Sequence, residues 1–271
     1  MNHEPIHLKR YFSQLDPETD PTLTFYADDG ILAETRPVIL ILPGGGYSMI
    51  SGREGAPIAK RFARAGFITT VLSYSVAPKR FPVQMSEVAA ALEFIHLKAE
   101  EWKLDSNRIT ILGFSAGGHL AAHYTNAYDS EKVRSIFPDS KPVHATILCY
   151  PVITAIPPYA DQHTFEELLG KNLTDEERRA FSCEKMVSPK TPATFIWHTA
   201  QDKVVPVENS ILYASACSKN RVPFELHIYP YGPHGLATVD RETNENLSKK
   251  EELAADWIPA CVSWLGNCWS D

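Results

Sequence analysis

One serine of the 271-residue chain stands in a setting that could make it a nucleophile. Ser115 is the centre of GFSAG, residues 113–117, between an apolar run that ends at Leu112 and an alanine-rich stretch. A serine on a sharp strand-to-helix turn needs small residues two positions before and after it, and the helix N-terminus beneath it favours developing negative charge. We therefore predict that Ser115 is a nucleophile. The plainer alternative is a serine that only caps a helix in a tight turn.

A serine hydroxyl is a poor nucleophile at neutral pH and needs an adjacent base. Of the ten histidines, His234 lies in the Gly/Pro loop YPYGPHG, residues 229–235, directly after an apolar run. Because such a loop can bring an imidazole into a cleft, we predict that His234 is the general base and not a surface-loop histidine. His198, at the end of another predicted strand, is its main rival. His119, one helical turn after Ser115, is expected to be a packed supporting residue.

The imidazolium that forms during such chemistry needs a carboxylate to orient and stabilise it. Asp202 lies in the loop TAQDKVVP, which follows the predicted strand 193–198. Ser, Asp and His in this chain order are typical of α/β-hydrolases and differ from the orders of chymotrypsin and subtilisin. We predict that Asp202 completes a catalytic triad. The alternative is that it is only a turn or capping residue.

Three consecutive glycines, Gly44–Gly46, follow the apolar run 38–42. Acyl transfer develops an oxyanion that is best held by preorganised backbone N–H groups. We predict an oxyanion hole formed by the N–H groups of Gly45, Gly46 and Ala116, the residue after the nucleophile. A phosphate-binding loop is excluded because the glycines form neither GxxxxGK[ST] nor GxGxxG.

The composition is that of a globular protein, with 44% hydrophobic and 22% charged residues. The net charge of −7 argues against nucleic acid or an anionic membrane as the partner. The first residues, MNHEPIHLKRYF, have no secretory apolar region, and no apolar run reaches the length of a membrane span. The five cysteines have long spacings and no CxxC, which predicts neither disulfides nor a zinc site. We expect a cytoplasmic protein with reduced thiols, and we predict no metal or cofactor.

The pattern of apolar runs predicts a single α/β domain over residues 1–271. Alternating strands and helices indicate right-handed crossovers and a mostly parallel central sheet with helices on both faces. The irregular stretch 152–191, after the sixth strand, is expected to be an inserted lid or cap. The glycine clusters fall at the carboxyl ends of predicted strands, where the sites of α/β proteins lie. The predicted strands are 6–12, 23–26, 38–42, 67–74, 108–112, 144–150, 193–198 and 223–229, and the predicted helices are 55–65, 82–103, 116–128, 207–220 and 249–264.

Several of these segments together resemble one family. They are PGGGY at 43–47, SYSVAP at 73–78, GFSAGGHLA at 113–121, HTAQDKVVPVENS at 198–210 and GPHG at 232–235. The chain resembles the hormone-sensitive-lipase-like esterases of the α/β-hydrolase superfamily and, more narrowly, bacterial acetyl-xylan-esterase-like (BD-FAE-type) proteins. Pro43 stands where many of these esterases have the histidine of HGGG, and Ser75 and Val76 stand where Arg and Leu are usual. The resemblance implies the α/β-hydrolase fold and hydrolysis of carboxylic esters.

Motifs and resemblance together predict a metal-independent serine esterase that acts on short acyl groups, with acetyl favoured. Tyr47, Ile153 and Val205 are expected to wall a small acyl pocket. The expected partner is a small-molecule or oligosaccharide ester such as an acetylated oligosaccharide, and a homodimer is left open. Two alternatives remain. One is an amide hydrolase, either a small peptidase or an arylformamidase, and the other is a catalytically silent binding protein of the same fold.

Overall fold

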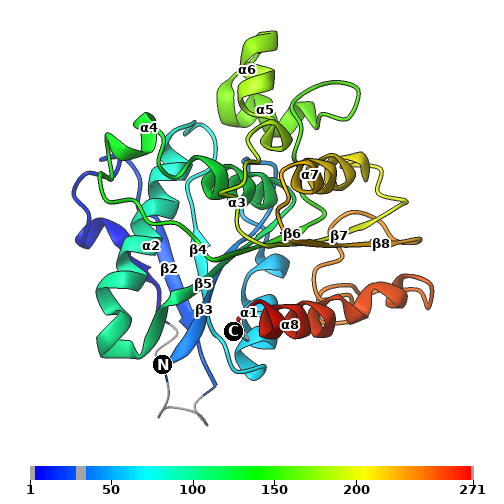
Figure 1. Ribbon diagram of the computed structural model, residues 1–271, viewed down its shortest axis with the longest axis horizontal. Coiled ribbons are helices and arrows are strands. Elements are labelled where there is room, and N and C mark those ends of the chain that lie inside the picture. The colour runs from blue at the N-terminus through cyan, green and yellow to red at the C-terminus, as the bar shows by residue number, and fades with distance from the viewer. Residues whose placement is uncertain (1–3, 29–34, 270–271) are drawn as a thin grey trace.

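The computed structural model describes residues 4–28 and 35–269, and an eight-stranded sheet runs through them (Figure 1). The strands are β1 (Ile6–His7), β2 (Thr22–Tyr26), β3 (Arg36–Leu42), β4 (Ile68–Ser73), β5 (Leu104–Phe114), β6 (Ala145–Cys149), β7 (Thr194–Thr199) and β8 (Phe224–Tyr229). Their order across the sheet is β1-β2-β4-β3-β5-β6-β7-β8. The β1–β2 and β2–β4 pairs are antiparallel, and the six strands from β4 to β8 pair in parallel. The predicted mostly parallel sheet is confirmed.

Helices cover both faces of this sheet. The α-helices are α1 (Ala56–Arg64), α2 (Val83–Trp102), α3 (Ser115–Ala127), α4 (Glu131–Arg134), α5 (Gln162–Leu169), α6 (Asp175–Ala180), α7 (Glu208–Lys219) and α8 (Trp257–Cys268). The 3-10 helices are η1 (Leu8–Arg10), η2 (Gly52–Glu54), η3 (Cys183–Lys185) and η4 (Glu251–Asp256). Helices α2, α3 and α7 lie on one face, and α1 and α8 lie on the other (Figure 1). No helix in the described part of the chain has both the length and the apolar character needed to cross a membrane.

The apolar run in β3 shows why the sheet needs both layers. Val38, Leu40 and Leu42 belong to the buried cluster under α2 and α3, whereas Ile39 and Ile41 belong to the cluster under α1 and α8. All five side chains are fully buried. Successive side chains of a strand point to opposite faces, so a strand that is apolar at every position must be covered on both sides.

Two predicted elements at the ends of the chain differ from the structure. The predicted strand 6–12 holds only the two residues of β1 and then turns into η1, because Leu8 is buried and its N–H donates to the Pro21 carbonyl oxygen. The predicted helix 249–264 is η4 followed by α8, which extends to Cys268. Pro259 lies in the first turn of α8, where a residue without an N–H is tolerated, so it favours the start of the α-helix there. The short helix α4 was not predicted.

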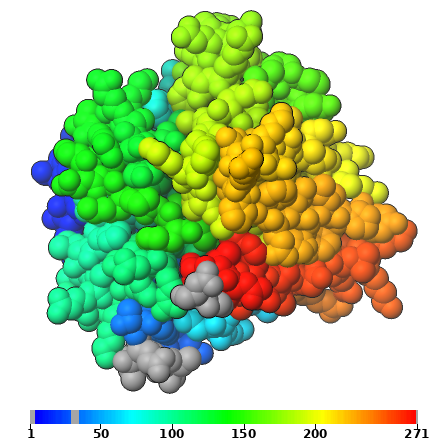
Figure 2. All heavy atoms as spheres, viewed as in Figure 1, coloured from blue at the N-terminus to red at the C-terminus, as the bar shows by residue number. Residues whose placement is uncertain are grey.

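The segment between β6 and β7, which we call the insertion (residues 152–191), carries α5, α6 and η3. It forms the rounded yellow-green projection at the top of the surface in Figure 2, above α3 and α7 in Figure 1. A capping box starts α6, since the Thr174 side chain accepts from the Glu177 N–H and the Glu177 carboxylate accepts from the Thr174 N–H. The insertion therefore has regular structure of its own. Its role as a cap stays a prediction.

Candidate active site

Ser115 stands on a sharp turn between β5 and α3. Its φ of 52° is a left-handed conformation that a residue with a Cβ rarely adopts, and its side chain is nearly buried. A Cβ on Gly117 would lie 2.2 Å from the Leu42 carbonyl oxygen, so the first turn of α3 packs directly on the end of β3. Strain of this kind persists only where the surrounding structure over-determines it. Here the strained turn places the Ser115 side chain at the carboxyl-end edge of the sheet.

Two further side chains join Ser115 in a continuous line of hydrogen bonds. The Ser115 hydroxyl lies 2.8 Å from His234 Nε2, and His234 Nδ1 lies 2.6 Å from Asp202 Oδ2. Their positions follow from the fold, because the three residues stand at or after the carboxyl ends of β5, β8 and β7. With the His234 proton on Nδ1, Nε2 accepts from the serine hydroxyl. The arrangement is therefore able to pass a proton from serine to imidazole.

The Asp202 carboxylate is surrounded by N–H donors. Its Oδ1 accepts from the backbone N–H groups of Val204 and Val205 at 2.9 and 3.0 Å, while its Oδ2 faces His234 and also His198 Nε2 at 3.2 Å. Burial raises the pKa of Asp202, but the hydrogen bonds from His198 and His234 outweigh it and hold the pKa well below the usual 3.8. Asp202 is therefore an ionised carboxylate that faces the imidazole.

The rival histidine, His198, lies behind Asp202 and not beside the serine. It is fully buried, and its Nδ1 is 2.8 Å from the Ser210 hydroxyl. Its Nε2 lies 3.0 Å from the Val205 carbonyl oxygen as well as close to Asp202, which requires the proton on Nε2. With Nδ1 accepting from Ser210, both ring nitrogens have partners. His198 thus holds the carboxylate in place.

The loop of residues 43–47, here called the glycine loop, lies against Ser115. Gly45 has a φ of +127°, and a Cβ there would stand 2.1 Å from the Met49 carbonyl oxygen, so only glycine fits. The backbone N–H groups of Gly45, Gly46 and Ala116 have no acceptor among the described residues. Unpaired N–H groups next to a serine are available for an oxygen atom that carries negative charge.

The three residues expected to wall an acyl pocket lie elsewhere. Tyr47, Ile153 and Val205 are fully buried, and none of them lines the cavity above Ser115. The Tyr47 hydroxyl lies 3.0 Å from Nδ1 of His119, whose Nε2 meets the Phe181 carbonyl oxygen at 3.0 Å. Burial lowers the pKa of His119 to about 4, so the ring is neutral at pH 7. His119 is a packed supporting residue, as predicted.

The cavity above Ser115 has a volume of about 550 Å³. Most of its walls are glycines and polar side chains, and Met49 and Val204 are the larger apolar residues that line it. The insertion contributes Asp161 and His163, and the His163 ring would stand 3.3 Å from a Cβ on Gly46. A neighbouring cavity of about 680 Å³ also includes Val204 and His234 in its lining. The serine therefore opens onto a cleft that extends past the histidine. The lining residues are Gly45, Gly46, Ser48, Met49, Ser51, Gly52, Arg53, Glu54, Ser115, Asp161, His163, Val204, His234 and Gly235.

One buried carboxylate in this cavity wall was missed by the sequence analysis. Glu54 Oε2 accepts from the Gly44 N–H at 2.8 Å, although Glu54 lies ten residues later in the chain. The stretch SGREGAP at 51–57 contains no spacing that marks a catalytic carboxylate. The one available signal was a charged residue within a run of small residues close to the predicted oxyanion hole.

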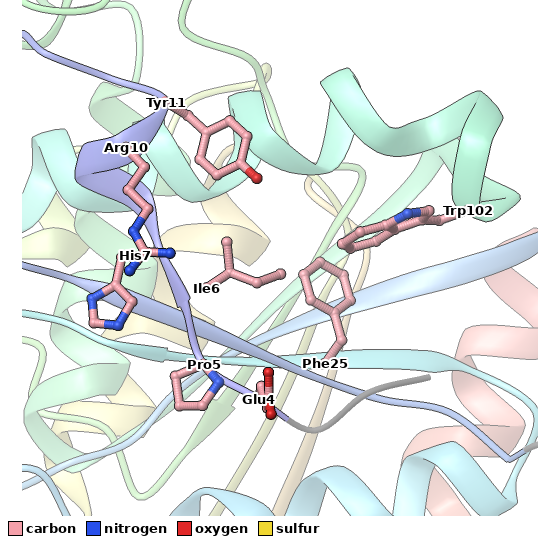
Figure 3. A pocket seen from close by; sticks show the side chains of 8 residues that line it. All are labelled: Glu4, Pro5, Ile6, His7, Arg10, Tyr11, Phe25 and Trp102. Carbon is pink, nitrogen blue, oxygen red and sulfur yellow. The ribbon is translucent and has the colours of Figure 1, made fainter.

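A separate cavity, of about 460 Å³, lies near the N-terminal end of the chain (Figure 3). The rings of Tyr11, Phe25 and Trp102 stand around Ile6, and His7 lies on the other side. Trp102 ends α2 just before β5 begins, so this cavity lies towards the amino end of β5, whereas Ser115 follows its carboxyl end. The His7 ring is paired with Asp20 at 2.7 Å. The lining of this cavity holds no serine or cysteine that could act as a nucleophile. Within residues 4–28 and 35–269, no group of three or more His, Cys, Asp or Glu side chains is placed to hold a metal ion.

The chain is similar to known proteins in both sequence and structure. The family model described as BD-FAE matches residues 25–217, which include the glycine loop, Ser115 and Asp202. The chain is 38% identical over 221 residues to Endo-1,4-beta-xylanase B of Butyrivibrio fibrisolvens, covering 76% of this chain and 33% of that protein. It is 30% identical over 203 residues to Acetylxylan esterase of Xylanibacter ruminicola, covering 73% of this chain and 40% of that protein.

The chain therefore spans about a third to two fifths of the length of these two curated relatives. Among solved structures, it matches the acetyl ester-xyloside bifunctional hydrolase from Caldicellulosiruptor lactoaceticus with a TM-score of 0.84 and 33% identity. That match covers 98% of this chain and 96% of the other, and the fold is that of an α/β-hydrolase.

Proposed function

The chain belongs to the BD-FAE family of α/β-hydrolase esterases, and we propose that it is a serine-type carboxylic ester hydrolase for short acyl groups. The observation that carries the proposal is the line of hydrogen bonds from Ser115 through His234 to Asp202, at 2.8 and 2.6 Å. A hydroxyl, a base and an orienting carboxylate in this geometry are the parts that nucleophilic acyl transfer requires. A binding protein of this fold would not need all three, so the complete line argues against the silent alternative.

In the proposed mechanism, Ser115 Oγ attacks the ester carbonyl carbon while His234 Nε2 takes the hydroxyl proton. The ionised Asp202 stabilises the imidazolium and keeps the remaining proton on Nδ1. Collapse of the tetrahedral intermediate expels the alcohol, which receives the proton from Nε2. Water then gives a proton to the same nitrogen, attacks the acyl-enzyme and releases the carboxylic acid, and Ser115 regains its proton.

The negative charge of each tetrahedral intermediate would rest on the unpaired N–H groups of Gly45, Gly46 and Ala116. These donors belong to a tight glycine turn and to the start of a helix, so they need little reorganisation when the charge develops. In other serine hydrolases the removal of one such donor costs about 100- to 1000-fold in kcat. The glycine loop would therefore contribute to rate and much less to ground-state binding.

The residues that line the cleft favour a short acyl group and a polar alcohol. A long acyl chain needs an apolar channel, and Met49 and Val204 provide little of one. Hydroxyls and charges along the cleft, such as those of Ser48, Ser51 and Arg53, suit a sugar-like alcohol. The names of the xylan-ester relatives agree with this preference. We therefore propose acetyl esters of carbohydrates, as small molecules or oligosaccharides, as the substrate class.

The decisive experiment replaces the nucleophile. Ser115→Ala should lose turnover of p-nitrophenyl acetate by about 10⁶-fold, since removal of this group in a triad enzyme has an effect of that order. Ser135→Ala is the matched control, because its exposed hydroxyl donates to the Lys132 carbonyl oxygen, away from the cleft. Wild-type turnover in Ser115→Ala would overturn the proposal.

The substrate class is tested with three panels on the wild-type protein. We expect p-nitrophenyl acetate to exceed the octanoate in kcat/KM, and acetylated xylo-oligosaccharides to release acetate. Aryl formamides and small peptides test the amide alternative, because the same triad could hydrolyse an amide. Preference for octanoate would reject the short-acyl proposal, and faster hydrolysis of an amide than of any ester would favour the amide alternative.

A further inference from the structure

Glu54 is a buried carboxylate in the wall of the cleft, and the proposed mechanism does not use it. Glu54 is only 3% exposed. Among the described residues, no lysine, arginine or histidine lies within 4.0 Å of its carboxylate. A buried polar group is costly unless hydrogen bonds satisfy it. Here Oε2 accepts from the Gly44 N–H at 2.8 Å and Oε1 accepts from the Tyr150 hydroxyl at 2.8 Å.

The first of these contacts fixes the glycine loop against the nucleophile. A Cβ placed on Gly44 would stand 2.9 Å from the Ser115 Cβ and 2.8 Å from Glu54 Oε2, so no side chain fits between the loop, the serine and the carboxylate. The Gly44 N–H is bonded to Glu54, whereas the N–H groups of Gly45 and Gly46 have no acceptor among the described residues. Glu54 thus holds the start of the glycine loop next to the two N–H groups proposed to meet an oxyanion.

The second contact reaches the loop that carries the general base. Tyr150 directly follows β6, is 2% exposed and has a φ of 37°, a strained conformation for a residue with a side chain. Its hydroxyl oxygen accepts from the Ala237 N–H at 3.1 Å, three residues after His234. Its ring packs edge-on against the His234 ring, with 5.0 Å between centroids. Tyr150 therefore supports the histidine both through the backbone and through its ring.

We propose that Glu54 and Tyr150 are a positioning pair that couples the glycine loop to the histidine loop, residues 230–237. The pair holds the oxyanion donors and the general base at one fixed separation around Ser115. Neither residue exchanges a proton or touches the reacting atoms. Since the reaction needs both loops aligned in the transition state, the pair acts on kcat more than on KM. This inference rests on the proposed function of the same site.

Two conservative substitutions test the pair. Glu54→Gln keeps the volume, but its NH₂ group cannot accept a hydrogen bond, so either the Gly44 N–H or the Tyr150 O–H loses its acceptor. Tyr150→Phe keeps the ring and removes the hydroxyl. We expect each to lower kcat for p-nitrophenyl acetate by about 10- to 100-fold with KM within about twofold, because a small misplacement of catalytic groups has effects of this order. The double variant should be no slower than the slower single variant, since both break one unit.

Matched controls separate positioning from general loss of burial. Glu184→Gln changes another buried carboxylate, 8% exposed, which accepts from the Thr154 hydroxyl at 3.2 Å in the insertion. Tyr213→Phe removes the hydroxyl of another fully buried tyrosine, which lies on α7. That hydroxyl accepts from the Asn126 side-chain amide at 3.0 Å. Both controls should keep kcat within about twofold of wild type, since neither touches the cleft.

Two readouts separate the pair from a merely structural role. All rates are divided by the concentration of sites labelled by a fluorophosphonate probe, so unfolded protein does not lower them. The low-field proton signal of the His234–Asp202 hydrogen bond should persist in both variants, because that bond is not touched. If Glu54→Gln does not fold, Tyr150→Phe alone decides, since it removes one oxygen atom and preserves the packing.

The inference is wrong if the folded variants keep kcat within about twofold of wild type, or if the double variant shows the product of the two single losses. Both results leave the proposed function intact as long as Ser115→Ala is inactive. Turnover in Ser115→Ala would instead overturn the proposed function. The two failures are therefore distinguishable in one set of variants.

Discussion

His198 and Asp202 share a hydrogen bond that places a second imidazole on the carboxylate facing His234. His198 Nε2 lies 3.2 Å from Asp202 Oδ2, and His234 Nδ1 lies 2.6 Å from the same oxygen. Since His198 Nε2 also faces the Val205 carbonyl oxygen at 3.0 Å, its proton is on Nε2, and His198 is a donor towards Asp202. His198 thus orients the Asp202 carboxylate, and the carboxylate in turn accepts from His234.

His198→Asn should lower kcat by about tenfold with little change in KM, because Asp202 would lose a donor that keeps it in the plane of His234. The measurement is steady-state hydrolysis of p-nitrophenyl acetate. Ser210→Ala should have a smaller effect, since His198 would still bond to Asp202. An unchanged kcat in folded His198→Asn would mean that this histidine only fills the core.

Asp202→Asn should lower kcat by about 10⁴-fold, because an amide facing Nδ1 favours the wrong imidazole tautomer. It should also lower the melting temperature at pH 7. The folded-state pKa of Asp202 lies below its ordinary value of 3.8, so ionisation stabilises the fold above that pH and the contribution is lost as pH falls through the lowered pKa. Thermal unfolding should therefore show a constant difference between the two proteins from pH 8 to pH 5. A difference that shrinks within this range would contradict the lowered pKa.

Gly45→Ala should abolish most esterase activity, because its Cβ would stand 2.1 Å from the Met49 carbonyl oxygen and the loop would have to move. Loss of aligned oxyanion donors predicts a decrease of about 100-fold or more in kcat. Gly66→Ala is the matched control, since Gly66 also has a positive φ, +98°, but no atom lies within 4 Å of the added Cβ. That control should lose some stability and keep its kcat. Equal effects of the two substitutions on kcat would argue against the assigned oxyanion donors.

Tyr47→Phe should lower stability and leave KM for acetyl esters unchanged. The Tyr47 hydroxyl is fully buried against His119 Nδ1, and removing it leaves the ring nitrogen without a donor. A loss of roughly 1 kcal/mol is expected, which corresponds to a melting temperature lower by about 2–4 °C. A clear change in acyl-chain preference would instead support the role in the acyl pocket that the sequence predicts for Tyr47.

The chemistry proposed for the site could be predicted from the sequence because each part depends on local constraints. Ser115 needs glycines two positions away on both sides, and Gly45 needs a positive φ, so both leave a mark in the order of residues. His234 and Asp202 follow predicted strands of a parallel sheet, whose carboxyl ends share one edge. The strands themselves were recognisable because buried parallel strands are apolar throughout.

Other parts of the site left no such mark. Glu54 and Tyr150 lie 96 residues apart and meet only because β3 and β6 are both neighbours of β5 in the sheet. Val204, and not Val205, lines the cleft, because side chains one position apart point in different directions at the end of a loop.

The sequence by itself therefore determined the fold class and the residues proposed for the triad and the oxyanion hole, since strand patterns and glycine positions are set by neighbours in the chain. Only the tertiary structure decided that Tyr47 is buried beneath the site, that His198 stands behind Asp202 and that Glu54 joins two loops. Those relations depend on side-chain packing between distant segments, and packing has no period that the order of residues could reveal.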